Sequence, residues 1–356
     1  MNKKLIALAV AGATFAPAVM AQSANPVTLY GRIWVMANSV KAEGGPAVPI
    51  GNRVTVVDES SLIGFRGQED LGGGLKAFFQ LESSAPPDAG GGTFGSRNSG
   101  VGLTGGFGTI LLGKWDSPMK LSAIFVDPYA QNTIGNQLAV VNVGNFNRRE
   151  NNMIQYWTPN WGGFSARFMY GANEGKTATA NPSNGSFYLD YAKGPFRINY
   201  AYEKHKDQRG AVVTAGVDEK QQNVAGTAVF GPVKLGLLFQ KMEGTARTDR
   251  HGAEASGVYT AGKNEFIINY GRNRNGASTL CVTTGTSTVC PKEPETKMLG
   301  VGYNYNFSKR TTFMMRYADI KNNAQAALSD ASFGFNTAVA NDQDPKGFGA
   351  GFRHTF

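Results

Sequence analysis

The sequence is poor in the residues on which disulfide-rich domains and many enzymes depend. It has two cysteines and three histidines among 356 residues, and none of them has the spacing of a Cys/His zinc site. Gly-x-Ser-x-Gly and His-Glu-x-x-His motifs are absent, and no helical pattern follows the glycine-rich runs. We therefore expect no catalytic site, no metal and no cofactor.

Charge and long apolar runs are also scarce. Charged residues make up 17% of the chain, against about 25% in soluble domains. Beyond the N-terminus there is no run of about 18 apolar residues, which excludes a protein with several transmembrane helices. The net charge is +9, but the cations are dispersed without a basic run, which argues against nucleic-acid binding. What is abundant is glycine, with 46 residues, and aromatic side chains, at 11%.

The first residues are typical of a secretory signal. Lys3 and Lys4 precede a short apolar stretch, and small residues before Gln22 predict cleavage after Ala21. We therefore expect residues 1–21 to be a signal peptide and residues 22–356 to form the folded domain. Export would place Cys281 and Cys290 in an oxidising compartment, where a disulfide between them would staple a local hairpin.

Alternation of apolar and polar residues with a period of two predicts β-strands along the whole chain. The last residues illustrate it, because Phe348, Phe352 and Phe356 share one face and Arg353 lies on the other. About sixteen such segments are expected, at 27–40, 54–68, 75–84, 95–104, 109–118, 151–158, 163–172, 185–192, 195–205, 222–230, 233–243, 255–261, 264–273, 296–306, 311–321 and 346–356. Short and long connections alternate between them, as in transmembrane barrels with tight periplasmic turns and long outer loops.

The polar faces of these strands carry Arg, Lys, Asn and Gly, which a dry core would accommodate only at a large desolvation cost. In a membrane barrel the same groups line a water-filled lumen, and the apolar faces contact lipid. Aromatic residues near strand ends, Tyr30 and Tyr170 among them, would then form interfacial girdles. A soluble, lectin-like sandwich is the alternative architecture.

Several stretches resemble the Gram-negative general porins of the neisserial and burkholderial type. The opening Val27–Gly31 is similar to the first strand of that family, and the stretch from Leu62 to Ala77, LIGFRGQEDLGGGLKA, is similar to its strand–turn–strand signature. Segments 101–114 and 151–164 follow the same pattern, and the terminal Phe356 resembles the assembly signal of such barrels.

This resemblance implies an all-β fold, namely a 16-stranded antiparallel transmembrane β-barrel whose third long loop, about 119–150, folds inward. It also implies a homotrimer in the outer membrane of a Gram-negative bacterium, in contact with lipid and lipopolysaccharide and inserted by the barrel assembly machinery. The function that it implies is passive diffusion of small hydrophilic solutes through a water-filled channel.

The working part of such a channel is a constriction with charged walls. We expect its basic wall to contain Arg149 and Lys114, which occupy positions where the family has arginines. Strand parity places Lys114 outward with Leu112, so the two arguments disagree for this residue. Arg32 and Arg66 have lumen parity and complete the expected wall.

Further lumen-lining residues are expected from parity: Trp34, Lys76, Arg167, Arg197, Arg316 and Arg353. Acids of lumen parity are fewer, and they are Glu82, Asp190 and Glu203. The family commonly has an arginine where this chain has Leu62, and that substitution removes one cation. The basic excess nevertheless predicts a weak to moderate preference for anions.

Asp127 is the acid that we expect on the inward loop, opposite the basic wall; the alternative role for an Asp before Pro128 is to form a turn. The leading functional hypothesis is a diffusion porin. A substrate-preferring channel of the same fold is the nearest alternative, favoured by Trp34, Trp115 and the altered constriction. A surface adhesin or a barrel enzyme such as a lipid hydrolase is the alternative from a different class.

Overall fold

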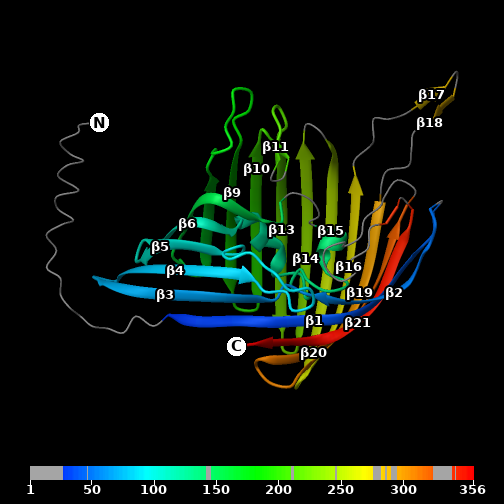
Figure 1. The fold of residues 1–356 in the computed structure, drawn as a ribbon, viewed down its shortest axis with the longest axis horizontal. Helices are drawn as coiled ribbons and strands as arrows, with labels where there is room; N and C mark the ends of the chain where they lie inside the picture. The colour runs from blue at the N-terminus through cyan, green and yellow to red at the C-terminus, as the bar shows by residue number, and fades with distance from the viewer. Residues whose placement is uncertain are drawn as a thin grey trace.

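The strands form one closed barrel, which confirms the predicted fold. The computed structural model describes residues 27–45, 47–141, 146–209, 212–244, 247–275, 282–284, 287–289, 295–323, 339–340 and 342–356. Seventeen strands belong to a single antiparallel sheet, and β21 pairs back onto β1. Because β2 and β3 both pair with β1, they share one position, and the barrel has sixteen strand positions (Figure 1).

The observed strands follow the alternating segments, with ends that differ by a few residues except in β15, which begins eight residues before the expected segment 255–261. They are β1 (Thr28–Glu43), β2 (Ile50–Asp58), β3 (Leu62–Gly72), β4 (Leu75–Ser84), β5 (Ser99–Gly105), β6 (Gly108–Asp116), β7 (Arg149–Trp157), β8 (Phe164–Gly171), β9 (Ser183–Lys193), β10 (Phe196–Lys206), β13 (Glu219–Phe230), β14 (Val233–Gly244), β15 (Arg247–Ala261), β16 (Asn264–Asn275), β19 (Glu295–Asn306), β20 (Thr311–Asn322) and β21 (Asp344–Thr355). Two small hairpins lie in long loops: β11 (Gln208–Arg209) with β12 (Val212–Val213), and β17 (Val282–Thr284) with β18 (Ser287–Val289).

The second predicted strand is interrupted between β2 and β3. Ser60 has a φ of 75°, and the Asp58 carboxylate accepts hydrogen bonds from the backbone N–H groups of Ser60 and Ser61 at 3.2 and 2.9 Å. An aspartate that bonds to the backbone two residues further on forms a turn that competes with the sheet ladder. Glu59 projects from this break and holds the inward loop, as described below.

Side chains alternate between the lumen and the outer surface as the sequence indicates. On β1, Trp34 and Met36 are buried on the lumen side, whereas the intervening parity places Ile33 on the outer surface, where it is 39% exposed. The outward faces of β14 and β16 are also apolar and exposed at Leu235, Leu237, Phe239, Phe266 and Ile268. Tyr30 departs from the predicted girdle, because its hydroxyl donates to Glu82 on the lumen side.

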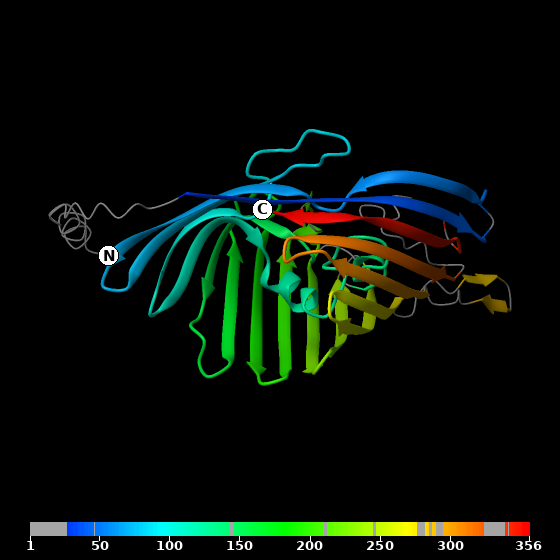
Figure 2. The ribbon, with the colours of Figure 1, turned by 90° about the horizontal axis from the view of Figure 1, so that it is seen from below.

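The long connection between β6 and β7 enters the barrel. It begins with α2 (Pro118–Ile124), which the alternation pattern did not indicate, and contains the short 3₁₀ helix η1 (Gln137–Ala139). Figure 2 shows the helix, in teal, between the strands coloured blue and those coloured green. Among the described residues no helix is long and apolar enough to cross a bilayer. The predicted signal peptide and Cys281 and Cys290 lie outside the described residues, so both remain predictions.

Candidate pore constriction

The inward loop, residues 117–148, is hydrogen-bonded to barrel strands far from its own ends. Met119 N–H donates to Ser186 Oγ of β9 at 3.2 Å, and Ser256 Oγ of β15 donates to the Val126 carbonyl at 2.7 Å. Near the tip, Asn269 Nδ2 of β16 donates to the Gly135 carbonyl at 2.8 Å. The tip is also tied to the β2–β3 break, because the N–H of Thr133 donates to Glu59 Oε2 at 2.8 Å.

Apolar contacts seat the same loop against the β9–β21 side of the lumen. Met119 and Phe146 pack with Tyr188, Ala201 and Met242. A larger cluster joins loop residues to five strands, and its members are Val40, Ala123, Val126, Ile134, Val140, Val141, Ala225, Leu238, Met298, Ala318 and Ile320. The loop therefore fills one side of the barrel, including the long-loop half of β1, and leaves open a space beside β3, β4, β6 and β7.

Glycines on the lumen face of β19 make room for the loop. A Cβ placed on Gly302 would lie 3.0 Å from Tyr129 Cε1, and one placed on Gly300 would lie 3.2 Å from Tyr129 Oη. Larger residues at these positions would have to displace the Tyr129 ring. Part of the abundant glycine in this chain is thus explained by the space that the inward loop occupies.

A cavity of about 590 Å³ remains between the loop and the opposite wall. Its lining residues are Arg32, Ser60, Leu62, Glu82, Ser96, Arg97, Asn98, Lys114, Asp116, Lys120, Ile124, Ala130, Gln131, Asn132, Leu138, Asn147, Arg148 and Arg149. The lining residues from the central part of the inward loop are uncharged, and they are Ile124, Ala130, Gln131, Asn132 and Leu138. The lining cations come from the barrel wall, from the second loop (Arg97) and from the two ends of the inward loop (Lys120 and Arg148). We call this space the constriction.

Most cations of the constriction have an acidic partner. Arg97 Nε lies 2.6 Å from Glu82 Oε1. Asp116 Oδ1 lies 2.9 Å from Lys120 Nζ and 3.2 Å from Arg149 Nε. A further pair, Arg148 with Glu150, stands at the start of β7.

Arg32 and Lys114 are the two constriction cations without an acidic partner in the described part of the chain. Arg32 donates to the carbonyl and the hydroxyl of Ser60 at 2.9 and 3.1 Å, and its guanidinium lies 5.5 Å from the Trp34 ring centroid. The excess of six lining cations over two lining acids makes the wall positive.

A β-bulge resolves the disagreement over Lys114. The pairing of β6 with β7 shifts register between Gly113 and Trp115, and Gly113 has a φ of 140°, a conformation that favours glycine. The bulge interrupts the alternation that would have placed Lys114 outward with Leu112. Lys114 therefore lines the constriction although simple parity predicts otherwise.

Arg66 does not belong to the constriction, contrary to our expectation. It is exposed, outside the lining set, and its guanidinium lies 5.0 Å from the Tyr30 ring centroid. Its partner positions on neighbouring strands are Thr28 and Gln80, four residue pairs beyond Leu62 toward the short-turn end. The residue has the expected lumen parity but the wrong depth.

Several predicted lumen residues are held against aromatic rings. Arg167 lies over Trp157 and Arg353 over Trp34, at 4.4 and 5.3 Å from the centroids, and Lys76 is half-buried near the short-turn end of β4. Trp34 itself is 1% exposed, so it packs rather than lining open water.

Arg197 and Arg316 lie beneath the loop. Arg197 pairs with Asp190 at 2.7 Å under the Phe125 ring. Arg316 is 2% exposed and donates to Asn304 Oδ1 at 2.8 Å, so it does not line the open part of the lumen.

The prediction of Asp127 as the opposing acid is contradicted by its position. Asp127 is buried and accepts hydrogen bonds from the backbone N–H groups of Tyr129, Gln131 and Gln137 at 2.9, 2.8 and 3.3 Å. It thus organises the turn at the loop tip, which is the alternative role that Asp before Pro128 indicated. Among the lining residues, the central part of the loop therefore contributes no charge to the constriction.

Replacing Asp127 by alanine should loosen the loop tip. Three buried N–H groups would lose their acceptor, and each unsatisfied group costs about 1–3 kcal/mol. We expect a noisier open-channel current and new protease cleavage within the loop, and Asp127→Asn, which keeps one carbonyl acceptor, should have a smaller effect. An alanine variant with the noise and protease resistance of the parent would contradict this role.

Sequence reasoning missed four charged residues of the constriction: Arg97, Asp116, Lys120 and Arg148. Lys120 lies in α2, where Ser117 caps the helix by accepting from Lys120 N–H and Pro118 occupies the first turn. Ser followed by Pro is a recognised helix start, so this helix had a sequence signal. Arg97 had none, because it precedes β5 and reaches Glu82 only through the folded second loop.

Comparisons with known proteins agree with this architecture. A family model described as Gram-negative porin matches residues 7–325. Outer membrane porin protein 32 of Delftia acidovorans is 31% identical over the full length of both chains, and major outer membrane protein P.IB of Neisseria gonorrhoeae is 29% identical, covering 88% of this chain and 92% of its own. The solved structure of an anion-selective porin from Comamonas acidovorans superposes with a TM-score of 0.79 at 26% identity, covering 93% of this chain and 100% of that one.

Proposed function

The chain belongs to the Gram-negative porin family and forms an outer-membrane channel for passive diffusion, and on this premise we propose that the channel prefers anions. The observation that carries the proposal is the charge of the constriction, whose lining has six cations and two acids, with no charged residue from the central part of the loop. A surplus of fixed positive charge in a narrow, partly desolvated passage raises the local concentration of anions.

Arg32, Lys114 and Arg149 are the side chains to which we assign this selectivity. Arg149 shares Asp116 with Lys120, so its charge is only partly offset, whereas Arg32 and Lys114 have no acidic partner among the described residues and should contribute most to the field. The anion-selective structural neighbour is consistent with this sign. We propose no catalytic role, because the lumen residues serve to pack the loop or to charge the passage.

Planar-bilayer recordings of the purified protein test the assignment. We expect stepwise currents in KCl whose conductance rises with salt without saturation, as in a water-filled diffusion pore. A current that saturates with one class of solute would favour the substrate-preferring channel, and the absence of any conductance would favour an adhesin or a barrel enzyme.

We also propose a homotrimer, since porins of this family are generally outer-membrane trimers. Contacts with lipopolysaccharide and insertion by the barrel assembly machinery belong to the same proposal. Voltage-induced closure in three equal steps is the expected signature of three independent pores in one particle.

Phe356 is the proposed assembly signal, and its environment gives a specific test. Its N–H donates to the Gly31 carbonyl at 3.0 Å, its own carbonyl accepts from Gly31 N–H, and its side chain is 44% exposed. Phe356→Ala should sharply reduce the heat-modifiable, folded protein in the outer membrane, whereas Phe348→Ala, which removes an outward aromatic of β21, should reduce it little. Equal yields from the two variants would remove the special role of the last residue.

A further inference from the structure

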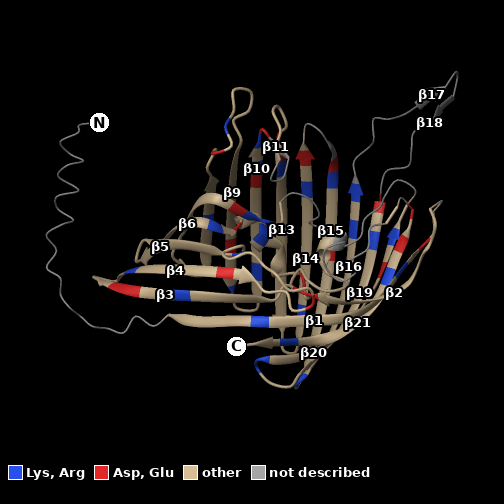
Figure 3. Cartoon of the chain, in the orientation of Figure 1, with Lys and Arg blue, Asp and Glu red and all other residues tan. Residues whose placement is uncertain are grey.

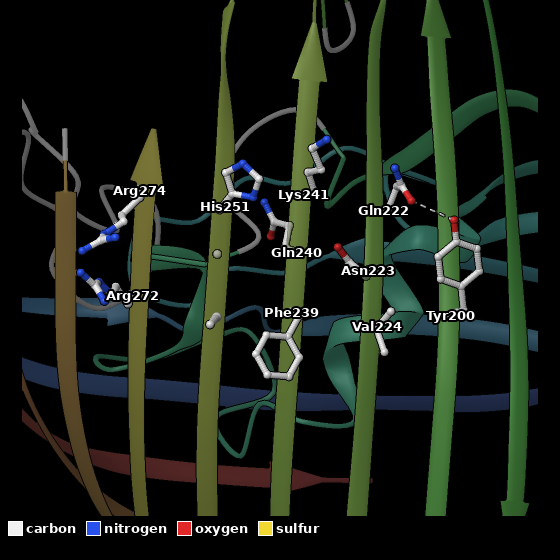
Figure 4. Close-up of a pocket in the computed structure, with 12 residues that line it drawn as sticks. Tyr200, Gln222, Asn223, Val224, Phe239, Gln240, Lys241, His251, Arg272 and Arg274 are labelled. Atoms are coloured by element: carbon white, nitrogen blue, oxygen red, sulfur yellow. Dashed lines mark hydrogen bonds between the residues drawn. The ribbon is translucent and has the colours of Figure 1, made fainter. Parts of the chain in front are cut away.

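A second charged feature lies on the outside of the barrel, facing away from the constriction. A groove of about 450 Å³ crosses β10, β13, β14, β15 and β16, and its polar lining includes Gln222, Lys241, His251, Arg272 and Arg274 (Figure 4). Lys241 has the strand parity of Phe239, which is 58% exposed on the outer surface, and Arg272 and Arg274 have the parity of Tyr270, which is 45% exposed. These cations therefore point outward. We call this site the basic groove.

The groove and its margin carry more positive than negative charge. Glu295 is shared by Arg272, Arg274 and Lys297, the latter two at 3.4 and 3.8 Å. Glu243 is likewise shared by Lys241 and Lys220, at 2.8 and 3.1 Å. Asp249 is close enough to Lys241 for an electrostatic attraction between the two side chains. The groove and its margin thus carry three acids against these five cations, and the imidazole of His251 also lines the groove.

The excess is local to this side of the barrel. On the β20–β21–β1 side, three outward lysines and three outward acids pair with one another. They are Lys41, Lys321 and Lys346 with Glu43, Asp319 and Asp344. Both groups lie near the long-loop ends of their strands, where Figure 3 shows blue and red bands together. The balanced side provides a natural control for the basic groove.

An apolar groove continues directly from the basic one. It measures about 460 Å³, is lined by Phe196, Ile198, Leu235 and Leu237 among others, and shares Val224 and Phe239 with the basic groove. The cations lie on the long-loop side of Phe239, as Figure 4 shows. A single ligand that occupied both grooves would need an anionic head and an apolar tail.

We propose that the two grooves form a binding site for a phosphorylated glycolipid of the outer leaflet. Its phosphate would lie against Lys241, Arg272 and Arg274, and an acyl chain would follow Phe239, Val224 and Leu237. Arginine forks match phosphate oxygens and strengthen such contacts through charge-assisted hydrogen bonds. The proposal rests on the lipopolysaccharide contact put forward above and deepens it, because it names the residues and the chemical group that they recognise.

Native mass spectrometry of the purified trimer with added lipid A tests the site. The triple variant Lys241→Gln, Arg272→Gln, Arg274→Gln should retain about tenfold less lipid A than the parent. The control triple variant Lys41→Gln, Lys321→Gln, Lys346→Gln should retain an amount within about twofold of the parent's. Undiminished retention in the first variant, or an equal loss in both, would overturn the proposal.

A second measurement uses the unmodified protein, so it does not depend on how the variants fold. The parent trimer should prefer lipid A to dephosphorylated lipid A by about tenfold in EDTA, and equal retention of the two would overturn the proposal. A preference that is present without EDTA and lost in EDTA would mean that a divalent cation held by the acids binds the phosphate, and this would also overturn the proposal.

Two controls identify the ligand and separate this site from the pore. Inorganic phosphate at the same concentration should not displace lipid A, because it lacks the acyl chain; displacement would reduce the site to a simple anion site and overturn the glycolipid assignment. Single-channel conductance should be the same in all three proteins. If the lipid-retention results differ from those expected while the parent still conducts, only the glycolipid proposal fails. If the parent does not conduct, the proposed channel function fails as well.

Discussion

Replacing Arg32 and Lys114 together by glutamine should remove most of the anion preference of the channel. These are the two constriction cations that no described acid neutralises. After screening, each should contribute about 0.5 kcal/mol to the difference between anion and cation permeation, so the double variant should lower the permeability ratio on the order of fivefold. The reversal potential in a KCl gradient measures this ratio.

The control for that experiment is a pair of outward cations. Arg274 and Lys297 share Glu295 on the outer surface, and their replacement by glutamine should leave the reversal potential unchanged. Replacement of Arg149 alone should shift selectivity less than the double variant does, since it also frees Asp116 from one partner. An unchanged reversal potential in the Arg32/Lys114 variant would show that selectivity arises elsewhere in the lumen.

Replacing residues 119–146 by a short Gly-Ser linker should raise single-channel conductance on the order of twofold, because a sixteen-stranded barrel without an inward loop encloses a wide aqueous channel. The same variant should admit larger neutral sugars in liposome-swelling assays. Replacing the outer-loop residues 208–217 by a linker of equal length is the matched control and should leave both quantities near those of the parent.

A milder variant guards against failure of the truncated barrel to fold, since truncation exposes apolar lumen residues such as Leu238 and Met242. Glu59→Ala removes the acceptor of the Thr133 N–H and should increase conductance fluctuations without loss of the barrel. Parental conductance in a folded truncation would mean that the loop does not narrow the pore.

The strands were predictable because alternation is a local property of the chain. In β10 and β21 every second residue faces lipid, and a shift of the strand by one residue would turn these apolar side chains into the lumen, so the register is well determined. The alternation of short turns with long loops then indicates that consecutive strands are neighbours. The inward loop and a basic excess in the lumen were expected from the family resemblance and from parity.

The details of the constriction were not predictable in the same way. The bulge at Gly113 reverses the parity of one residue, and it arises from pairing with β7 rather than from local sequence alone. Arg66 has the right parity but lies too far toward the short turns. Asp127 is consumed by backbone N–H groups of its own loop, and which cations are neutralised depends on contacts between residues far apart in sequence, such as Arg97 with Glu82.

The most direct test of the account is the reversal potential of the unmodified channel at two ionic strengths. Fixed cations in the constriction act across a Debye length of about 30 Å at 0.01 M salt but only about 3 Å at 1 M. We therefore predict that the reversal potential in a KCl gradient has the sign of the chloride equilibrium potential. The anion preference should grow as the mean salt concentration falls. A cation preference, or a ratio that does not change with salt, would contradict the claim that the charged wall of the constriction sets the selectivity.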